Sequence, residues 1–310
     1  MADFRKNHKR SNGTSNFSKS GLFALIVAVL FYLFNQGAEG GSEGTGERWE
    51  LPFPTEEKAK DTRDTKFKLH EYLPTSTTGQ MVQHQYYTLS YNEQHEQPEW
   101  VAYELTKKSI QAPNVKRTGD FRQDPKVKTG SAELYDYRGS GYDRGHLAPA
   151  GDMAFNKKAM SESFYLSNMS PQARQFNGGI WRELEELTRD WAYKFKKLYV
   201  VTGPLFDQPV KGRIGDNEVS IPSQYYKVLL DLEEPEQKGI AFILDNQVNF
   251  EPLYKFAVPI DVVEARTGID FFPELMDETL EARIESNSNV DLWPFNKKKY
   301  DLRNSKWNNR

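Results

Sequence analysis

The residues best suited to chemistry lie between positions 143 and 185 of this 310-residue chain. His146 follows the run Asp143-Arg144-Gly145, where glycine lets the backbone turn tightly and project the imidazole from the end of an extended segment. A histidine pKa near neutrality suits a general base, and Arg144 could neutralise a phosphate. The hydrolysis of a phosphodiester requires a base to activate water, a cation and positively charged groups to stabilise the phosphate.

Two oxygen donors follow downstream. Asn177 lies just before a predicted helix, and its amide oxygen is an acceptable magnesium ligand when waters fill the other positions. Glu185 lies eight residues further on. At about 100° per residue it falls roughly 80° off the same line and about two turns along the helix. The carboxylate could therefore reach toward the same ion through a bound water.

Each of these residues, taken alone, also has an ordinary structural interpretation. His146 fits a buried histidine with satisfied hydrogen bonds, and Arg144 fits a surface salt bridge. Asn177 fits the N-cap of the following helix, a role compatible with metal binding. Glu185 fits an exposed helix glutamate beside other glutamates. The chemical hypothesis depends on the combination.

Composition restricts the metal. The chain has no cysteine, which excludes disulfides, thiolate zinc sites, iron–sulfur clusters and a cysteine nucleophile. A metal would be held by His, Asp, Glu, Asn or water, a hard donor set that favours magnesium, calcium or manganese. The net charge of -3 argues mildly against nucleic-acid binding. An enzyme, however, needs only a local positive groove.

Hydrophobic patterning predicts the elements that position these residues. Strands are expected at residues 86–91 and 100–105, joined by a polar turn, and at 165–168, 198–202, 225–232 and 239–244. Helices are expected at 179–195, where apolar residues recur at helical spacing, and at 260–267, stopped by Gly268. Strands mixed irregularly with helices indicate the α+β class.

The N-terminal region predicts a membrane segment. Residues 21–34 carry no charge, basic residues precede them and glutamates follow. The positive-inside rule places residues 1–20 in the cytoplasm and the rest outside it. A cleaved signal peptide and a buried core helix are the alternatives. We expect a basic cytoplasmic N-terminus at 1–20, a transmembrane signal anchor at 21–38, a flexible linker at 39–66, a catalytic domain at 67–290 and a basic C-terminal tail at 291–310.

The motif region as a whole is similar to a known family. The run YDRGHLAPA at 142–150 resembles the signature of the DNA/RNA nonspecific endonucleases. The stretch FYLSNMSPQ at 164–172, then Asn177 and WRELE at 181–185, resembles the second block of that family in order and spacing. YRGSG at 137–141 and VTGPLF at 201–206 are further matches. The resemblance extends from about Tyr86 to about Phe272 and is closest to the endonuclease G branch.

This resemblance implies a ββα-metal fold with a mixed or antiparallel sheet, Mg²⁺ with Mn²⁺ as a substitute, and cleavage of DNA and RNA to 5′-phosphate ends. Homodimers are common in the family. Some members use a further upstream arginine, to which neither Arg117 nor Arg122 aligns securely. The implied roles are general base for His146, direct metal ligand for Asn177, orientation of metal-bound water for Glu185, phosphate binding for Arg144, and support of the site for Asp143, Asn168 and Gln172.

Two questions stay open at this level. The alternative function is a membrane-anchored nucleic-acid-binding protein without catalysis. The expected compartment is the bacterial inner membrane, with the catalytic domain outside the cytoplasm. A cleaved, secreted form and the mitochondrial inner membrane are the alternatives, and the segment lacks the long Arg- and Ser-rich form of a transit peptide.

Overall fold

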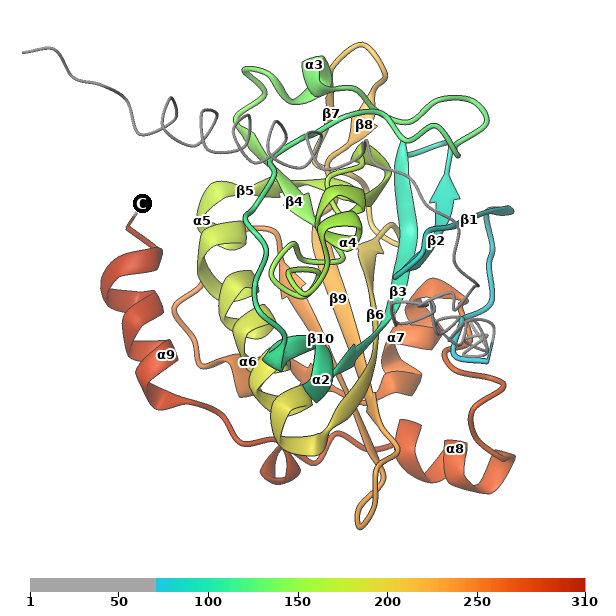
Figure 1. Ribbon diagram of the computed structural model, residues 1–310, viewed down its shortest axis with the longest axis vertical. Helices are drawn as coiled ribbons and strands as arrows, with labels where there is room; N and C mark the ends of the chain where they lie inside the picture. Colours follow the sequence, from blue (N-terminus) through green and yellow to red (C-terminus); the bar gives the residue numbers. More distant parts are fainter. Residues whose placement is uncertain (1–70, 310) are drawn as a thin grey trace, which may run out of the picture. The chain divides into compact units, whose positions relative to one another are not determined.

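A central antiparallel sheet organises the protein in the computed structural model, which describes residues 71–309. Its seven strands lie in the order β1-β2-β3-β6-β9-β10-β11 (Figure 1). All neighbouring strands in it are antiparallel. The strands are β1 (Gln80–Gln83), β2 (Thr88–Asn92), β3 (Gln97–Thr106), β6 (Lys197–Leu205), β9 (Gln224–Asp231), β10 (Lys238–Asp245) and β11 (Ala257–Val258).

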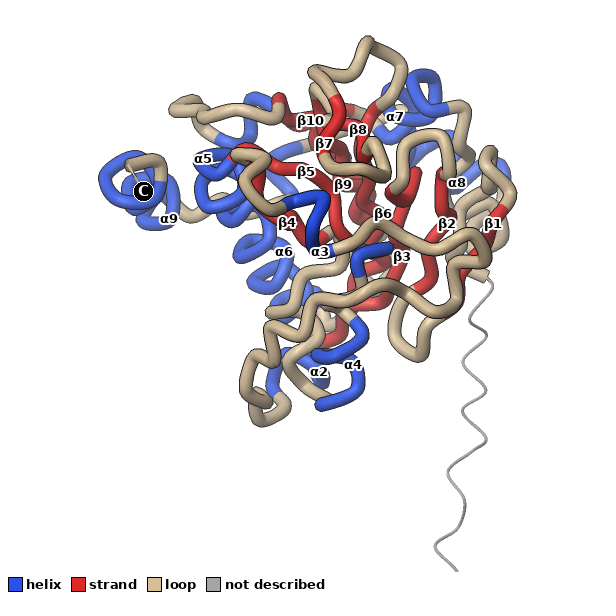
Figure 2. Tube along the Cα trace, turned by 90° about the horizontal axis from the view of Figure 1, so that it is seen from above, coloured by secondary structure: helices blue, strands red, loops and turns tan. Residues whose placement is uncertain are grey.

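Helices cover both faces of this sheet, which explains why β3, β6 and β9 are buried along almost their whole length (Figures 1 and 2). Along β6, Leu198 and Val200 join the core beneath α6 (Arg182–Phe195), whereas Tyr199 and Val201 face the opposite core. That second core includes residues of α7 (Ile260–Thr267) and α8 (Glu278–Glu285). Each fully buried large apolar side chain contributes about 1.5–3 kcal/mol.

A ββα unit lies beside the sheet. The strands β4 (Tyr142–His146) and β5 (Met169–Ala173) form a separate antiparallel pair. The chain between them contains α4 (Lys157–Glu162) and the 3-10 turn Leu166–Asn168. From β5 the chain passes directly into α5 (Arg174–Phe176), a wide turn of π type at Asn177–Trp181, and then α6.

The remaining elements are short. They are the helices α2 (Lys107–Gln111), α3 (Leu134–Tyr137) and α9 (Lys297–Leu302), the strand pair β7 (Arg213–Ile214) and β8 (Val219–Ser220), the 3-10 turns Leu253–Phe256 and Val290–Leu292, and the π turn Arg303–Trp307.

The α+β class and the antiparallel sheet predicted from the sequence are confirmed, as are the first hairpin, the long amphipathic helix and the helix that Gly268 ends in a left-handed conformation. The strand predicted at 165–168 is wrong. The chain turns at Leu166–Asn168, and β5 begins only at Met169. The turn is stabilised by the Asn168 side chain, whose hydrogen bonds to backbone groups compete with an extended conformation.

The C-terminal stretch that the sequence suggests as a basic tail packs onto the domain. Trp293 is fully buried, with its ring 5.2 Å from that of Trp191. Arg303 is also fully buried and pairs with Glu183 of α6 over 3.0 Å. Residues 21–38 lie outside the described part of the chain. Within residues 71–309, no helix has the length and apolar character needed to cross a membrane.

Candidate active site

The end of β4 is held by an asparagine clamp. The Asn168 amide donates to the carbonyl oxygens of Ala148 (3.0 Å) and Ser163 (2.8 Å), and its Oδ1 accepts from Ala148 N (2.8 Å). Asn168 is fully buried. All three bonds act on backbone, so this side chain fixes the path of the chain immediately after His146.

Gly145 has a packing role. It lies inside β4 opposite Ser170, and its φ is not among the positive values found in the described chain, so the tight turn expected there is absent. A Cβ at this position would lie 2.2 Å from Cδ and Oε1 of Gln172. Gln172 is fully buried, and its amide has no hydrogen-bond partner among the described residues. The glycine therefore makes room for Gln172 beside the strand that ends in His146.

His146 is a buried, neutral imidazole. It is 8% exposed, and its ring meets those of Phe164 and Phe121 edge-on, with centroids 4.9 Å and 5.7 Å away. Burial, and then the charge of Arg117, lowers its pKa to about 3, so the near-neutral pKa expected from the sequence is wrong. A hydrogen bond with the backbone of Arg144 opposes this shift. Nε2 has no partner within residues 71–309, which leaves one nitrogen able to accept a proton.

Asn177 is oriented by Asp143. Its Nδ2 donates to Asp143 Oδ2 over 3.0 Å, and Arg174 Nε lies 3.7 Å from Asp143 Oδ1. Because the nitrogen of the amide is engaged, Oδ1 is the atom left to bind a cation. The N-cap interpretation is wrong, since the backbone of Asn177 is itself helical and begins the π turn.

Glu185 lies in the first turn of α6, half-buried. Burial raises the pKa of its carboxyl group, as does Asp152, whereas the positive charges of Arg189, Lys227 and Arg117 lower it. Arg117 acts on the pKa of both Glu185 and His146. One arginine therefore acts on both α6 and the end of β4, although His146 and Glu185 are 39 positions apart.

A groove of about 780 Å³ is lined by Asp143 and Asn177, whereas His146 and Glu185 are not among its lining residues. Arg144 lines it, with its guanidinium 4.2 Å from the centroid of the Phe121 ring. Arg122 does not line it. Its guanidinium contacts Asp120 and Ser161 and lies 4.0 Å from the Tyr165 ring. The charged or amide side chains in the groove are Arg117, Arg138, Arg144, Arg174, Asp143 and Asn177.

Sequence reasoning missed Lys227. This lysine is fully buried on β9, and its Nζ has no hydrogen-bond partner among the described residues. It lies 5.0 Å from the centroid of the Trp181 ring. Strand alternation puts it on the α6 face with Tyr225 and Leu229, where burial lowers its pKa and Glu185 opposes that shift. A lysine at an apolar position of a buried strand was the signal available in the sequence.

The groove carries more positive charge than the sequence analysis identified. Arg138 and Arg174 line it together with Arg117 and Arg144. Arg138 lies in the YRGSG run, and Arg174 directly follows Ala173, the last residue of β5. These four arginines face one carboxylate, Asp143, among the groove's lining residues. The local positive groove expected from the sequence is thus present, despite a net charge of -3.

An antiparallel sheet with an attached ββα unit thus carries a histidine at the end of one strand and an asparagine in an arginine-lined groove. The family model for DNA/RNA non-specific endonucleases matches residues 69–278. The chain therefore belongs to the DNA/RNA non-specific endonuclease family and is an enzyme of that class.

Similar proteins agree with this assignment. The chain is 34% identical over 274 residues to the human mitochondrial nuclease EXOG, covering 83% of this chain and 70% of that protein. It is 38% identical over 226 residues to nuclease C1 of Cunninghamella echinulata var. echinulata, covering 66% and 87%. A crystal structure of the EndoG/EndoGI complex matches with a TM-score of 0.60 and 35% identity, covering 64% of this chain and 89% of that one.

Proposed function

We propose that this enzyme hydrolyses phosphodiester bonds of DNA and RNA without sequence preference and leaves 5′-phosphate ends. It would use Mg²⁺, with Mn²⁺ as a substitute. The observation that carries the proposal is that β4 positions two available atoms: it ends in His146, a neutral, buried imidazole with a free Nε2, and its Asp143 holds Asn177 so that the amide oxygen is free. The alternative, nucleic-acid binding without catalysis, gives no reason for either arrangement.

The donor set fits magnesium. Asn177 would hold the ion through one amide oxygen, and Glu185 would orient water bound to it. A site with one protein ligand leaves most positions to water, which suits an ion that gives up its hydration reluctantly. When bound, Mg²⁺ supplies charge stabilisation to the phosphate and the leaving oxygen.

The protein groups would then divide the reaction as follows. Nε2 of His146 takes a proton from the attacking water, a bond forms between that oxygen and phosphorus, and the bond from phosphorus to the 3′ oxygen breaks as that oxygen takes a proton from solvent water. Arg144 and Arg117 bind the phosphate from the groove.

Three further residues act as positioning residues. Asp143 holds Asn177, Asn168 fixes the chain that follows His146, and Gln172 packs against Gly145. Arg122, engaged elsewhere, has no part in this proposal.

The main test is a cleavage assay on plasmid DNA and on structured RNA. Wild type should cleave both with Mg²⁺, and EDTA should stop it. His146→Ala should lower the rate about 10²–10⁴-fold, the usual contribution of a general base. Asn177→Ala should lose activity at low Mg²⁺. Circular dichroism would confirm that both variants fold. A wild type that binds DNA but cleaves neither polymer would favour the non-catalytic alternative.

Salt dependence tests the absence of sequence preference. Contacts to phosphate carry no base information, and each released counterion adds to the slope of log binding constant against log salt. We expect Arg174→Ala, in the groove, to reduce that slope by about one on duplex DNA. Arg122→Ala, outside the groove, is the matched control and should leave the slope unchanged. Binding that stayed constant from low to high salt would argue against electrostatic recognition.

The compartment is a separate part of the proposal. The apolar segment at 21–38, with basic residues before it, would hold the catalytic domain on the non-cytoplasmic side of a membrane. The names of the human and yeast relatives carry the word mitochondrial, which supports the mitochondrial alternative over the bacterial one. Carbonate extraction and protease accessibility of the full chain in its own host would test this. Sedimentation of the purified protein would test for a homodimer.

A further inference from the structure

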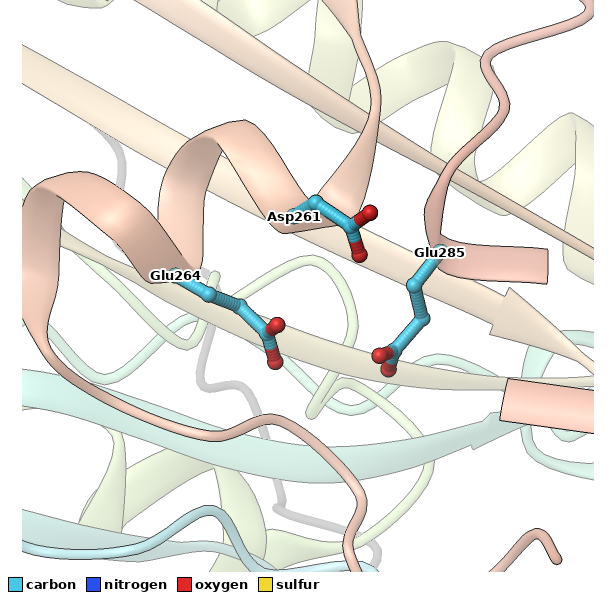
Figure 3. Close-up of side chains that lie close together, drawn as sticks. All are labelled: Asp261, Glu264 and Glu285. Carbon is cyan, nitrogen blue, oxygen red and sulfur yellow. The ribbon is translucent and has the colours of Figure 1, made fainter. Parts of the chain in front are cut away.

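Three carboxylates meet on the face of the sheet that lies away from α6. Asp261 and Glu264 are three residues apart on α7, so they share one face of that helix. Glu285 is the last residue of α8. One oxygen from each lies within 4.8 Å of the other two. Figure 3 shows the three carboxyl groups turned toward a common point.

A glycine of the sheet brings the two helices together. A Cβ on Gly239 of β10 would lie 2.7 Å from Ile260 Cδ1 and 2.8 Å from Ile284 Cγ2. Both isoleucines are buried and pack over this position. Ile260 immediately precedes Asp261, and Ile284 immediately precedes Glu285. Because Gly239 has no side chain, the two isoleucines, and with them the two carboxyl groups, can approach each other over β10.

Glu285 carries the second, independent observation. The residue is 4% exposed, and its Oε1 has no hydrogen-bond partner among residues 71–309. A buried carboxylate oxygen without a donor is costly in free energy unless something compensates it. Glu264 Oε1 accepts from Phe271 N over 2.8 Å, which fixes that carboxyl group and leaves its second oxygen for the cluster.

No positive side chain in the described part of the chain is among the charges that act most strongly on this site. Burial raises the pKa of Glu285 to about 9. The next contributions also raise it and come from acidic side chains, namely Glu264, Glu281, Asp261 and Asp270. Burial likewise raises the pKa of Glu264 to about 7. Glu285 also ends a helix, where the dipole adds negative potential.

We propose that Asp261, Glu264 and Glu285 form a binding site for Ca²⁺, separate from the active site. Calcium takes six to eight oxygen ligands at about 2.3–2.6 Å with flexible geometry. Oxygens that bind one such ion can be at most about 4.6–5.2 Å apart, twice the ligand distance. The three oxygens of the cluster, all within 4.8 Å of one another, are compatible with that limit. Asp261 is exposed, which lets water complete that shell.

The occupant would tie α7 to α8 and thereby stabilise the fold. Its site lies across the sheet from α6 and shares no residue with the groove. The proposal is therefore independent of the nuclease chemistry.

Thermal unfolding of the full-length protein, stripped of metal, tests the site with Ca²⁺ alone as the probe. We expect a rise in Tm of about 5 °C when Ca²⁺ is about a hundredfold above its Kd. Asn177→Ala should show the same rise, because it alters only the proposed catalytic metal site. Glu285→Gln and Asp261→Asn should lose it, and calorimetry in the Asn177→Ala background should lose one Ca²⁺ per chain on adding either substitution.

Two controls separate loss of the site from loss of the fold. In EDTA, Glu285→Gln should unfold at or above the wild-type Tm, because a neutral amide at this buried position avoids the cost of burying or protonating a carboxyl group there. Asp261→Asn alters an exposed side chain and should fold normally. Both should keep wild-type cleavage of plasmid DNA with Mg²⁺. The proposal is overturned by a wild type without a Ca²⁺ response, by an equal response in Glu285→Gln, or by a response to Mg²⁺ only.

Discussion

Asn177 Nδ2 lies 3.0 Å from Asp143 Oδ2, so the first residue of the motif holds an amide that is 34 positions further along the chain. This relationship makes Asp143 a positioning residue for the proposed metal ligand. Asp143→Ala should raise the Mg²⁺ concentration for half-maximal activity about 10–100-fold, with a smaller change at saturating Mg²⁺, since loss of a residue that orients a ligand has effects of this size. Asp143→Asn keeps an accepting oxygen and should recover most of the affinity. A Mg²⁺ requirement unaltered in Asp143→Ala would contradict the assignment.

The close packing of Gly145 against Gln172 predicts a coupled pair. Gly145→Ala should destabilise the fold by about 2–3 kcal/mol, because the added methyl group overlaps a fully buried side chain. Truncation in Gln172→Ala opens that space, so the double variant should lose less than the sum of the two single losses. Urea unfolding of all four proteins gives the coupling free energy, expected at about 1–2 kcal/mol. Strict additivity would show that the overlap is relieved elsewhere.

The environment of His146 predicts an unusual titration. Burial and the charge of Arg117 lower its pKa to about 3, so the imidazole should stay neutral from pH 8 down to pH 5. In the NMR spectrum of the metal-free enzyme its ring resonance, assigned with His146→Asn, should not shift in that range. In Arg117→Ala the pKa should rise, because a positive charge that disfavours the imidazolium is gone. Arg117→Lys, which keeps the charge, should behave like wild type. A His146 midpoint near 6.5 in wild type would contradict the prediction.

Lys227 is predicted to hold Glu185 in its charged form. Its buried charge lowers the pKa of that carboxyl group, against the burial that raises it. Lys227→Met should therefore move the acid limb of kcat/KM to higher pH, with recovery in alkaline buffer. A purely structural defect would lower kcat/KM equally at every pH. Lys238→Met is the control for a buried lysine, because Lys238 pairs with Asp231 on the neighbouring strand and has no link to Glu185.

Sequence periodicity located the elements in which one regular pattern of buried residues extends along the whole segment. The amphipathic spacing of 179–195 gave α6, and apolar runs gave β6, β9 and β10. The segment at 165–168 was misread because its apolar and aromatic residues suit a strand equally well. What decided the outcome was Asn168, because two of its three hydrogen bonds join the backbone groups of Ala148, 20 positions away in the sequence. No local pattern contains those partners.

The same limit applies to the site. Residue types and their order were enough to select His146, Asn177 and Glu185. The structure adds which neighbours act on them: Asp143 on Asn177, Arg117 on His146, Lys227 on Glu185. The reason for Gly145 was misjudged, because a glycine required by a neighbouring side chain looks in sequence like one required by a turn. The assigned roles of these residues stay predictions until the variants are measured.

The C-terminal segment has one more consequence. Beneath the turn that carries Asn177, a methyl group on Gly179 would lie 2.4 Å from Asn308 Oδ1, and the buried Arg303 joins the start of α6 through Glu183. The turn therefore rests on residues more than a hundred positions further along the chain. Side chains of α9 that lead to them are exposed. Proteolytic cleavage in α9 would remove this support and silence the nuclease without a protease ever entering the groove.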